Sequence, residues 1–133
     1  MPAPTPAFCR EILCLDAGIR FAGVADRIGR LVAAEYRPDL KKKPLLTKEE
    51  SELSAIQSIL RMGTRATLEG KLGRVVYAFT QYEKVKRATI PLAGGSILML
   101  SFDIRADHER IILGEILPRL RGRAAATTTA GRV

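Results

Sequence analysis

The stretch LTKEESELSAIQSILRMGTRATLEG, residues 46–70, carries the strongest helix pattern in the chain. Thr47 and Glu50 have the spacing of a capping box, in which each side chain accepts a hydrogen bond from the backbone N–H of the other residue. The acidic residues of the first turns lie where the helix dipole favours negative charge. Gly70 is a suitable residue to end a helix. This stretch therefore predicts a long central helix that ends near Gly70.

Apolar residues on this predicted helix form two stripes. The first stripe contains Leu53, Ile56, Leu60, Gly63 and Thr67, and the second contains Ala55, Ile59, Met62 and Ala66. Two adjoining stripes offer more apolar surface than packing on one sheet requires. We therefore expect the first stripe to bury Ile56 against the sheet, opposite Leu100, and the second stripe to be available for assembly.

Short apolar and β-branched runs on both sides of this helix predict strands. They are residues 19–25, 30–36, 74–82, 85–92 and 96–104, joined by turn signals at 26–29, 83–84 and 93–95. Residues 7–17 read as a first helix that Gly18 ends, and Asp107 is expected to cap a last helix that Pro118 kinks or ends. The apolar run Ile97–Leu100 does not alternate, which indicates a strand covered on both faces.

These elements predict an α+β sandwich with a five-stranded antiparallel sheet in the order α-β-β-α-β-β-β-α. The central helix should cover one face of the sheet, and the first and last helices the other. The strands at 30–36 and 74–82 should form the two edges. The length of 133 residues fits one domain, which we expect to span residues 7–121, between a disordered lead (1–6) and a disordered basic tail (122–133).

The net charge of +8 and the pI of about 10.0 raise the possibility of nucleic-acid binding. Four arginines after Glu115 supply half of the excess, so the charge is partly a property of the C-terminal end. The candidate contacts are Lys41, Lys42, Lys43, Lys84, Lys86 and Arg87, with Tyr77, Phe79 and Tyr82 as aromatic neighbours. Aromatic side chains on a sheet can stack on bases, so this interpretation stays open as an alternative.

Catalytic chemistry finds little support in the sequence. His108 is the only histidine, and its place at the start of the last helix favours a surface residue near a cap. No nucleophile motif, metal-ligand spacing or phosphate-binding loop is present. Cys9 and Cys14 are expected to be free, buried thiols in a reducing compartment. With no signal sequence and no apolar run long enough for a span, we expect a cytoplasmic protein without cofactor or metal.

The predicted order of helices and strands resembles the roadblock/LC7 fold, a relative of profilin-like and longin domains. At residue level, the stretches RFAGV (20–24), LTKEESELSAIQSILRMG (46–63), YEKVKRATIPL (82–92) and ADHERII (106–112) resemble an uncharacterised family of small proteins from ammonia-oxidising archaea (Thaumarchaeota). The archaeal family implies no activity. The roadblock resemblance implies dimerisation through the central helix and a sheet edge, and a role as a scaffold or as a regulator of small GTPases.

The sequence thus favours a non-enzymatic, homodimerising protein-interaction module with an unknown protein partner. Its predicted dimer interface contains Ala55, Ile59, Met62, Ala66, Val75, Val76, Tyr77 and Phe79. The long apolar edge strand supports this expectation, because exposed edges readily pair with other strands. Besides nucleic-acid binding, a PAS-like small-ligand sensor is a second alternative, for which the sequence offers no polar cluster within the expected core.

Overall fold

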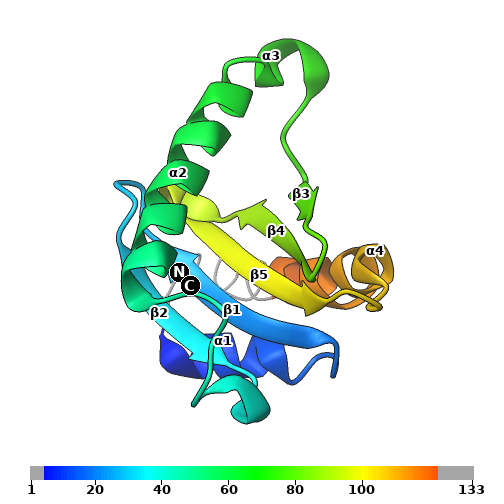
Figure 1. The fold of residues 1–133 in the computed structure, drawn as a ribbon. Helices are drawn as coiled ribbons and strands as arrows, with labels where there is room; N and C mark the ends of the chain where they lie inside the picture. The colour runs from blue at the N-terminus through cyan, green and yellow to red at the C-terminus, as the bar shows by residue number, and fades with distance from the viewer. Residues whose placement is uncertain (1–4, 123–133) are drawn as a thin grey trace, which may run out of the picture.

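The sheet forms the middle layer of the protein, as the computed structural model of residues 5–122 shows (Figure 1). Its five antiparallel strands lie in the order β2-β1-β5-β4-β3. Their bounds are β1, Ile19–Ala25; β2, Leu31–Tyr36; β3, Ala78–Gln81; β4, Val85–Pro91; and β5, Ile97–Asp103. The prediction that the second and third strands form the edges is therefore confirmed.

Tight turns join the neighbouring strands at the predicted places. Between β1 and β2, the Gly29 N–H donates to the Asp26 carbonyl at 2.9 Å, and Gly29 has a φ of 89°, a conformation that side chains disfavour. Between β3 and β4, the Tyr82 N–H donates to the Val85 carbonyl at 2.9 Å. These hairpins account for the antiparallel sheet.

One face of the sheet is covered by the two ends of the chain, as predicted. Helix α1 (Pro6–Leu13) and helix α4 (His108–Ile111), followed by the π-helical turn η3 (Ile112–Ile116), pack on this face. The buried cluster includes Ile12 from α1, Ile111 from α4 and Phe102 from β5. Thr5 caps α1, which begins one residue earlier than expected and ends at Leu13 rather than near Gly18.

Pro118 does not end the last helical segment, but the helix is distorted directly before it. Residues 117–122 are helical, and η3 lies directly before the proline. In η3 the Leu117 N–H donates to the Ile112 carbonyl, five residues back. A π-helical turn widens the helix locally, which gives the proline ring room where an α-helix would clash with it.

The central helix, α2 (Lys48–Ala66), covers the other face of the sheet. Its capping box is confirmed: the Glu50 N–H donates to Thr47 Oγ1 at 3.1 Å, and the Thr47 N–H donates to Glu50 Oε1 at 2.9 Å. The prediction that Gly70 ends this helix is wrong. Gly70 lies within the short helix α3 (Glu69–Leu72), and Gly73, with a φ of 85°, follows it.

The helix face that packs on the sheet also differs from expectation. Its buried residues are Ser51, Ala55, Ser58 and Met62. Leu53, Ile56 and Leu60 are 55%, 46% and 66% exposed, so the expectation that Ile56 is buried is wrong. The small side chains on the buried face let the helix approach the sheet, which larger residues would prevent. Leu100 is buried, but on the face that α1 and α4 cover.

Strand β3 is shorter than the predicted strand at 74–82. Its ladder runs only from the Ala78–Thr89 pair to the Gln81–Lys86 pair. Helix α2 extends past the sheet, and α3 lies at the far end of α2. The chain must therefore return to the sheet before β3 can begin (Figure 1). Residues 74–77 make this return and lie outside the strand.

Candidate functional site

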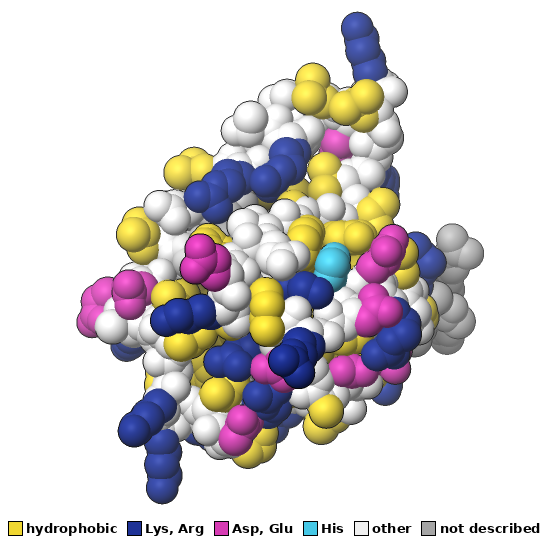
Figure 2. All heavy atoms as spheres, turned by 45° about the vertical axis from the view of Figure 1, so that its right-hand side comes forward, with side chains coloured by type: hydrophobic (Ala, Val, Ile, Leu, Met, Phe, Trp, Pro, Cys, Tyr) yellow, Lys and Arg dark blue, Asp and Glu magenta, His cyan; other side chains and the backbone are white. Residues whose placement is uncertain are grey.

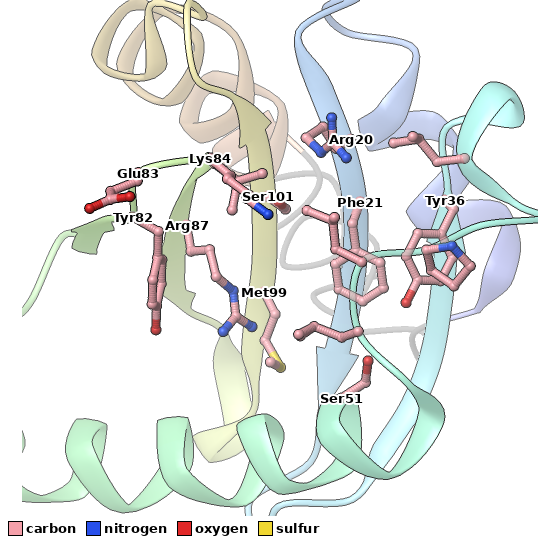
Figure 3. A pocket seen from close by; sticks show the side chains of 15 residues that line it. Arg20, Phe21, Tyr36, Ser51, Tyr82, Glu83, Lys84, Arg87, Met99 and Ser101 are labelled. Atoms are coloured by element: carbon pink, nitrogen blue, oxygen red, sulfur yellow. The ribbon is translucent and has the colours of Figure 1, made fainter.

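A cavity lies between the α2 face of the sheet and the segment before α2. Its volume is about 560 Å³, within the range typical of small-molecule sites. Figure 3 shows its floor on the sheet, with the first turns of α2 on one side and the β3–β4 turn on another. Its place on the sheet can be derived from the strand register.

The floor is a row of paired residues that crosses four strands. Arg87 of β4 pairs with Ser101 of β5, Ser101 pairs with Phe21 of β1, and Phe21 pairs with Tyr36 of β2. Residues paired in this way share one face of a sheet. The Phe21 and Tyr36 rings lie 4.9 Å apart at 51°, and the Met99 side chain lies beside this row (Figure 3).

Three chain segments form the walls of the cavity. The connector between β2 and α2 contributes Leu40, Pro44, Leu45 and Leu46, α2 contributes Ser51, and the β3–β4 turn contributes Tyr82, Glu83 and Lys84. The cavity exists because α2 begins only at Lys48 and presents serine and alanine to the sheet. A helix with large side chains at these positions would have filled this space.

Arg87 brings positive charge into this largely apolar site. Its Nη2 donates to Ser54 Oγ at 2.7 Å, and among residues 5–122 it makes no ion pair with a carboxylate. The other bases at the cavity differ, since Arg20 is paired with Asp103 at 3.0 Å and Lys84 is exposed on the turn. Glu83 is the one acidic residue in the lining, so the electrostatic balance of the site is positive.

A cluster of charges holds the connector that borders the cavity. Arg37 Nη1 donates to Asp103 Oδ2 at 2.6 Å, and Arg37 Nε donates to Asp39 Oδ1 at 2.7 Å. Desolvation acts to raise the pKa of Asp103, but hydrogen bonds from Arg37 and Arg20 and their charges outweigh it, so the pKa is lowered. The hydrogen bonds to Asp39 and Asp103 raise the pKa of Arg37. This cluster ties the connector to the end of β5.

The residues of the predicted dimer interface differ in burial, and four of them, Ala55, Ile59, Met62 and Val75, belong to one cluster inside the protein. On α2, Ala55 and Met62 are buried against the protein's own sheet, Ile59 is half-buried and Ala66 is exposed. The outer face of α2 instead presents the exposed stripe of Leu53, Ile56 and Leu60. The sequence missed this because both stripes have helical spacing, and spacing does not tell which of them meets the sheet.

The predicted interface residues near β3 are also divided. Val75 and Tyr77 are half-buried, whereas Val76 is exposed. The Phe79 ring stacks on His108, with centroids 3.9 Å apart and an angle of 5° between the planes. Basic and apolar side chains alternate over the face that carries α2, β3 and α4 (Figure 2).

His108 lies at the start of α4 beside the Asp107 cap, as predicted, and its ring is half-buried because Phe79 covers it. Its Nδ1 is buried and has no hydrogen-bond partner among the described residues. The two cysteines are free, as predicted, but only Cys9 is buried, since Cys14 follows the end of α1 and is exposed. Burial, and secondarily the charge of Glu35, raises the pKa of Cys9 to about 11. Its thiol is therefore protonated at neutral pH.

The basic candidates for nucleic-acid contact do not form one surface. Lys41, Lys42, Lys43 and Lys84 are exposed. Lys86 donates to the Ala106 carbonyl at 2.7 Å, and Arg87 faces the cavity. The tail arginines Arg123 and Arg132 lie outside the described residues. Lys41 Nζ lies 3.9 Å from Glu35 Oε2. Nucleic-acid binding stays an untested prediction, with three of its six basic candidates engaged within the fold.

Residues 5–122 contain neither a metal-binding cluster nor a membrane-spanning helix. No cluster of three or more His, Cys, Asp or Glu side chains there could hold a metal ion. In the same part of the chain, no helix combines the length and the apolar character that crossing a membrane requires.

The cavity was not foreseen from the sequence. Its lining comes from four strands, the connector, the start of α2 and the β3–β4 turn. Only strand register brings Arg87, Ser101, Phe21 and Tyr36 into one row. One signal was available: Pro44-Leu45-Leu46 places apolar residues in an otherwise lysine-rich connector. Such residues suggest that the connector covers an apolar surface.

Comparison with solved structures identifies the fold. The chain is similar to the gliding protein MglB of Thermus thermophilus, with a TM-score of 0.62 and 20% identity over 79% of this chain and 75% of that one. It is also similar to a roadblock/LC7 domain from Streptomyces avermitilis, with a TM-score of 0.64 and 9% identity over 90% and 99%. For MglC of Myxococcus xanthus the TM-score is 0.54 and the identity 14%, over 86% and 94%.

These similarities show that the chain has the roadblock/LC7 fold, as its sequence predicted. No protein-family model and no curated protein matches the sequence.

Proposed function

We propose that this protein is a non-enzymatic interaction module of the roadblock type that acts as a homodimer. The observation that carries the proposal is the exposed apolar stripe of Leu53, Ile56 and Leu60 on the outer face of α2. Leu68 and Leu72, which follow α2, are also exposed. Contiguous apolar surface of this kind on a soluble domain commonly marks an interaction site.

A second copy of the chain is the occupant that best fits this surface. Strand β3 is a short edge strand with one side unpaired, and Val76, 52% exposed, lies two residues before it. A two-fold axis would pair β3 with its copy and bring the two apolar stripes together, which is the commonest geometry of dimers. A similar solved structure, with 21% identity and a TM-score of 0.60 over 87% of this chain and 86% of that one, is described as MglB with tetrameric arrangement.

This proposal moves the interface on α2 by about a third of a turn, to the adjoining stripe. The originally predicted stripe has Ala55 and Met62 turned toward the protein's own sheet, so they cannot meet a partner without unfolding that contact. Val76 keeps its predicted role. We infer further, from the fold resemblance, that the dimer serves in the cytoplasm as a scaffold or as a regulator of a small GTPase. We also propose that the protein comes from a member of the Thaumarchaeota.

Sedimentation velocity at tens of micromolar tests the dimer. The unmodified protein should sediment as a dimer, and Leu60→Glu combined with Val76→Lys should sediment as a monomer, because each new charge would face an apolar surface or its own copy. Leu113→Glu is the matched control, since Leu113 is 45% exposed but lies in η3, on the opposite side of the sheet.

A monomer for the unmodified protein would refute the proposal. A dimer that survives the double substitution would place the interface elsewhere on the surface.

A further inference from the structure

We propose that the cavity beneath the first turns of α2 binds a small amphipathic carboxylate, a molecule with an apolar body and one carboxylate group. This goes beyond the proposed function, because the cavity lies on the sheet-facing side of α2, opposite the apolar stripe. The two sites can therefore be tested independently.

The lining fits an apolar body. Phe21 and Tyr36 form an aromatic pair on the floor, Met99 lies beside them, and Leu45 and Leu46 face them from the connector. Met99 has a flexible and polarizable side chain that adapts to ligands of varied shape. A cavity of about 560 Å³ can hold a small molecule and bury most of its surface.

The charge of the site selects an anion. Arg87 is half-buried and spends one donor on the neutral hydroxyl of Ser54. A guanidinium carries five N–H donors, and its planar fork matches a carboxylate. Figure 3 shows the Arg87 side chain extending from β4 toward Met99 and the cavity. Lys84 at the rim adds a second positive charge.

The shape of the site favours a small molecule over a peptide. Three chain segments bound it: the connector, the start of α2 and the β3–β4 turn. A peptide that binds by strand addition needs a free sheet edge beside its pocket. Of the four floor strands, β1, β5 and β4 are paired on both sides, and only β2, at the Tyr36 end of the row, is an edge. A ligand that contacts both Arg87 and Phe21 therefore lies across the face of the sheet.

Methionine methyl NMR provides a direct test, because the chain contains three methionines, Met1, Met62 and Met99. The probe is dodecanoate, added to full-length protein labelled with carbon-13 at the methionine methyl groups. We expect a saturable shift of the Met99 signal. Met62, buried between α2 and the sheet but not part of the cavity lining, should move much less. Dodecyltrimethylammonium, with the same chain and the opposite charge, should leave Met99 unmoved.

Three substitutions and one control test the assigned roles. Arg87→Gln should weaken dodecanoate binding by about tenfold or more, as expected for the loss of a charge-assisted hydrogen bond. Lys71→Gln removes the same charge from α3, away from the cavity, and should leave affinity unchanged. Ser101→Phe should block binding by filling the floor. Lys84→Gln, at an exposed position, is a milder variant that should weaken binding less than Arg87→Gln. An unchanged Met62 signal in each variant shows that the fold is retained.

Three results would overturn the proposal: a Met99 signal unmoved by dodecanoate, an equal response to the cationic probe, or equal affinities for Arg87→Gln and Lys71→Gln.

Discussion

The two faces of the sheet are covered in different ways. On the face of α1 and α4, sixteen buried residues form one cluster. On the α2 face the buried cluster has six, and the cavity lies beside it. The difference begins with side-chain size, since Ile111, Ile112 and Ile116 pack on the first face and Ser51, Ala55 and Ser58 on the second.

This asymmetry suggests that the α1/α4 face supplies most of the stability, whereas the α2 side carries the two proposed sites. Close packing of large side chains accounts for most of the apolar area that one domain can bury. If the α1/α4 face supplies most of this buried apolar area, the α2 face can have a smaller helix contact, a cavity and an exposed apolar stripe. We therefore expect substitutions on the two faces to have different consequences.

The largest expected difference compares two neighbours in β5. Leu100 and Met99 are 1% and 2% exposed and lie on opposite faces of the sheet. Leu100→Ala should lower the free energy of unfolding by about 2–5 kcal/mol. Met99→Ala should cost less, because its side chain borders an existing cavity and loses fewer packed neighbours. Urea denaturation of both variants measures the difference, and equal losses would contradict the asymmetry.

Ile56→Ala extends this comparison to the outer face of α2. With 46% of Ile56 exposed, the loss should be about half that of Leu100→Ala, since apolar stabilisation scales with buried area. A loss as large as that of Leu100→Ala would mean that a partner buries Ile56. Repeating the measurement over a range of protein concentrations separates the two cases, because stabilisation by a dimer depends on concentration.

The α1/α4 face was largely predictable from the sequence. The unbroken run Ile97–Leu100 indicated a strand covered on both sides, and turn residues such as Gly29 fixed the hairpins and hence the edges. These signals are local: each depends on residues that are close in the chain. The same is true of the Thr47 cap, which the hydrogen bonds confirm.

The α2 face was less predictable, because its structure depends on distant segments. The helix has apolar residues at helical spacing on two sides, and the packing face was decided by small residues, Ser51 and Ser58, that carry little hydrophobic signal. The cavity requires the register of four strands and the path of the connector. For the same reason the sequence did not indicate that Ala55 and Met62, two residues of the predicted interface, are buried against the protein's own sheet. The interface itself stays open to the sedimentation test.

A smaller effect is expected at the start of α2, which borders the cavity. Thr47→Ala removes the hydroxyl that accepts the hydrogen bond from the Glu50 N–H in the capping box. It should lower the free energy of unfolding by about 1 kcal/mol. Thr67→Ala, at the other end of α2, is the control. Its hydroxyl donates to the Thr64 carbonyl at 2.8 Å within an exposed turn, so its loss should be within about 0.5 kcal/mol. Thermal unfolding of both variants compares the two ends, and equal shifts would argue against the cap.

The smallest effect concerns Asp103, which links β5 to the connector over the α2 face. Its pKa is lowered in the folded protein because the hydrogen bonds from Arg37 and Arg20 outweigh desolvation. A lowered pKa stabilises the fold above the unfolded-state value of about 4, and this contribution is lost as the pH falls through the folded-state value. The side chain is 38% exposed, so solvent screening keeps the effect small.

Asp103→Asn tests this by removing the titrating group while keeping its size. The stability difference between the unmodified protein and this variant should be largest at neutral pH and should shrink as the pH falls below about 4. Urea denaturation at a series of pH values measures the difference. Because Asp16, Asp26 and Asp39 also have lowered pKa values, only the difference between the two proteins, and not the acid sensitivity of either, reports on Asp103. A difference that stays constant with pH would show that Asp103 holds the connector through its shape and neutral hydrogen bonds, and that its charge adds nothing.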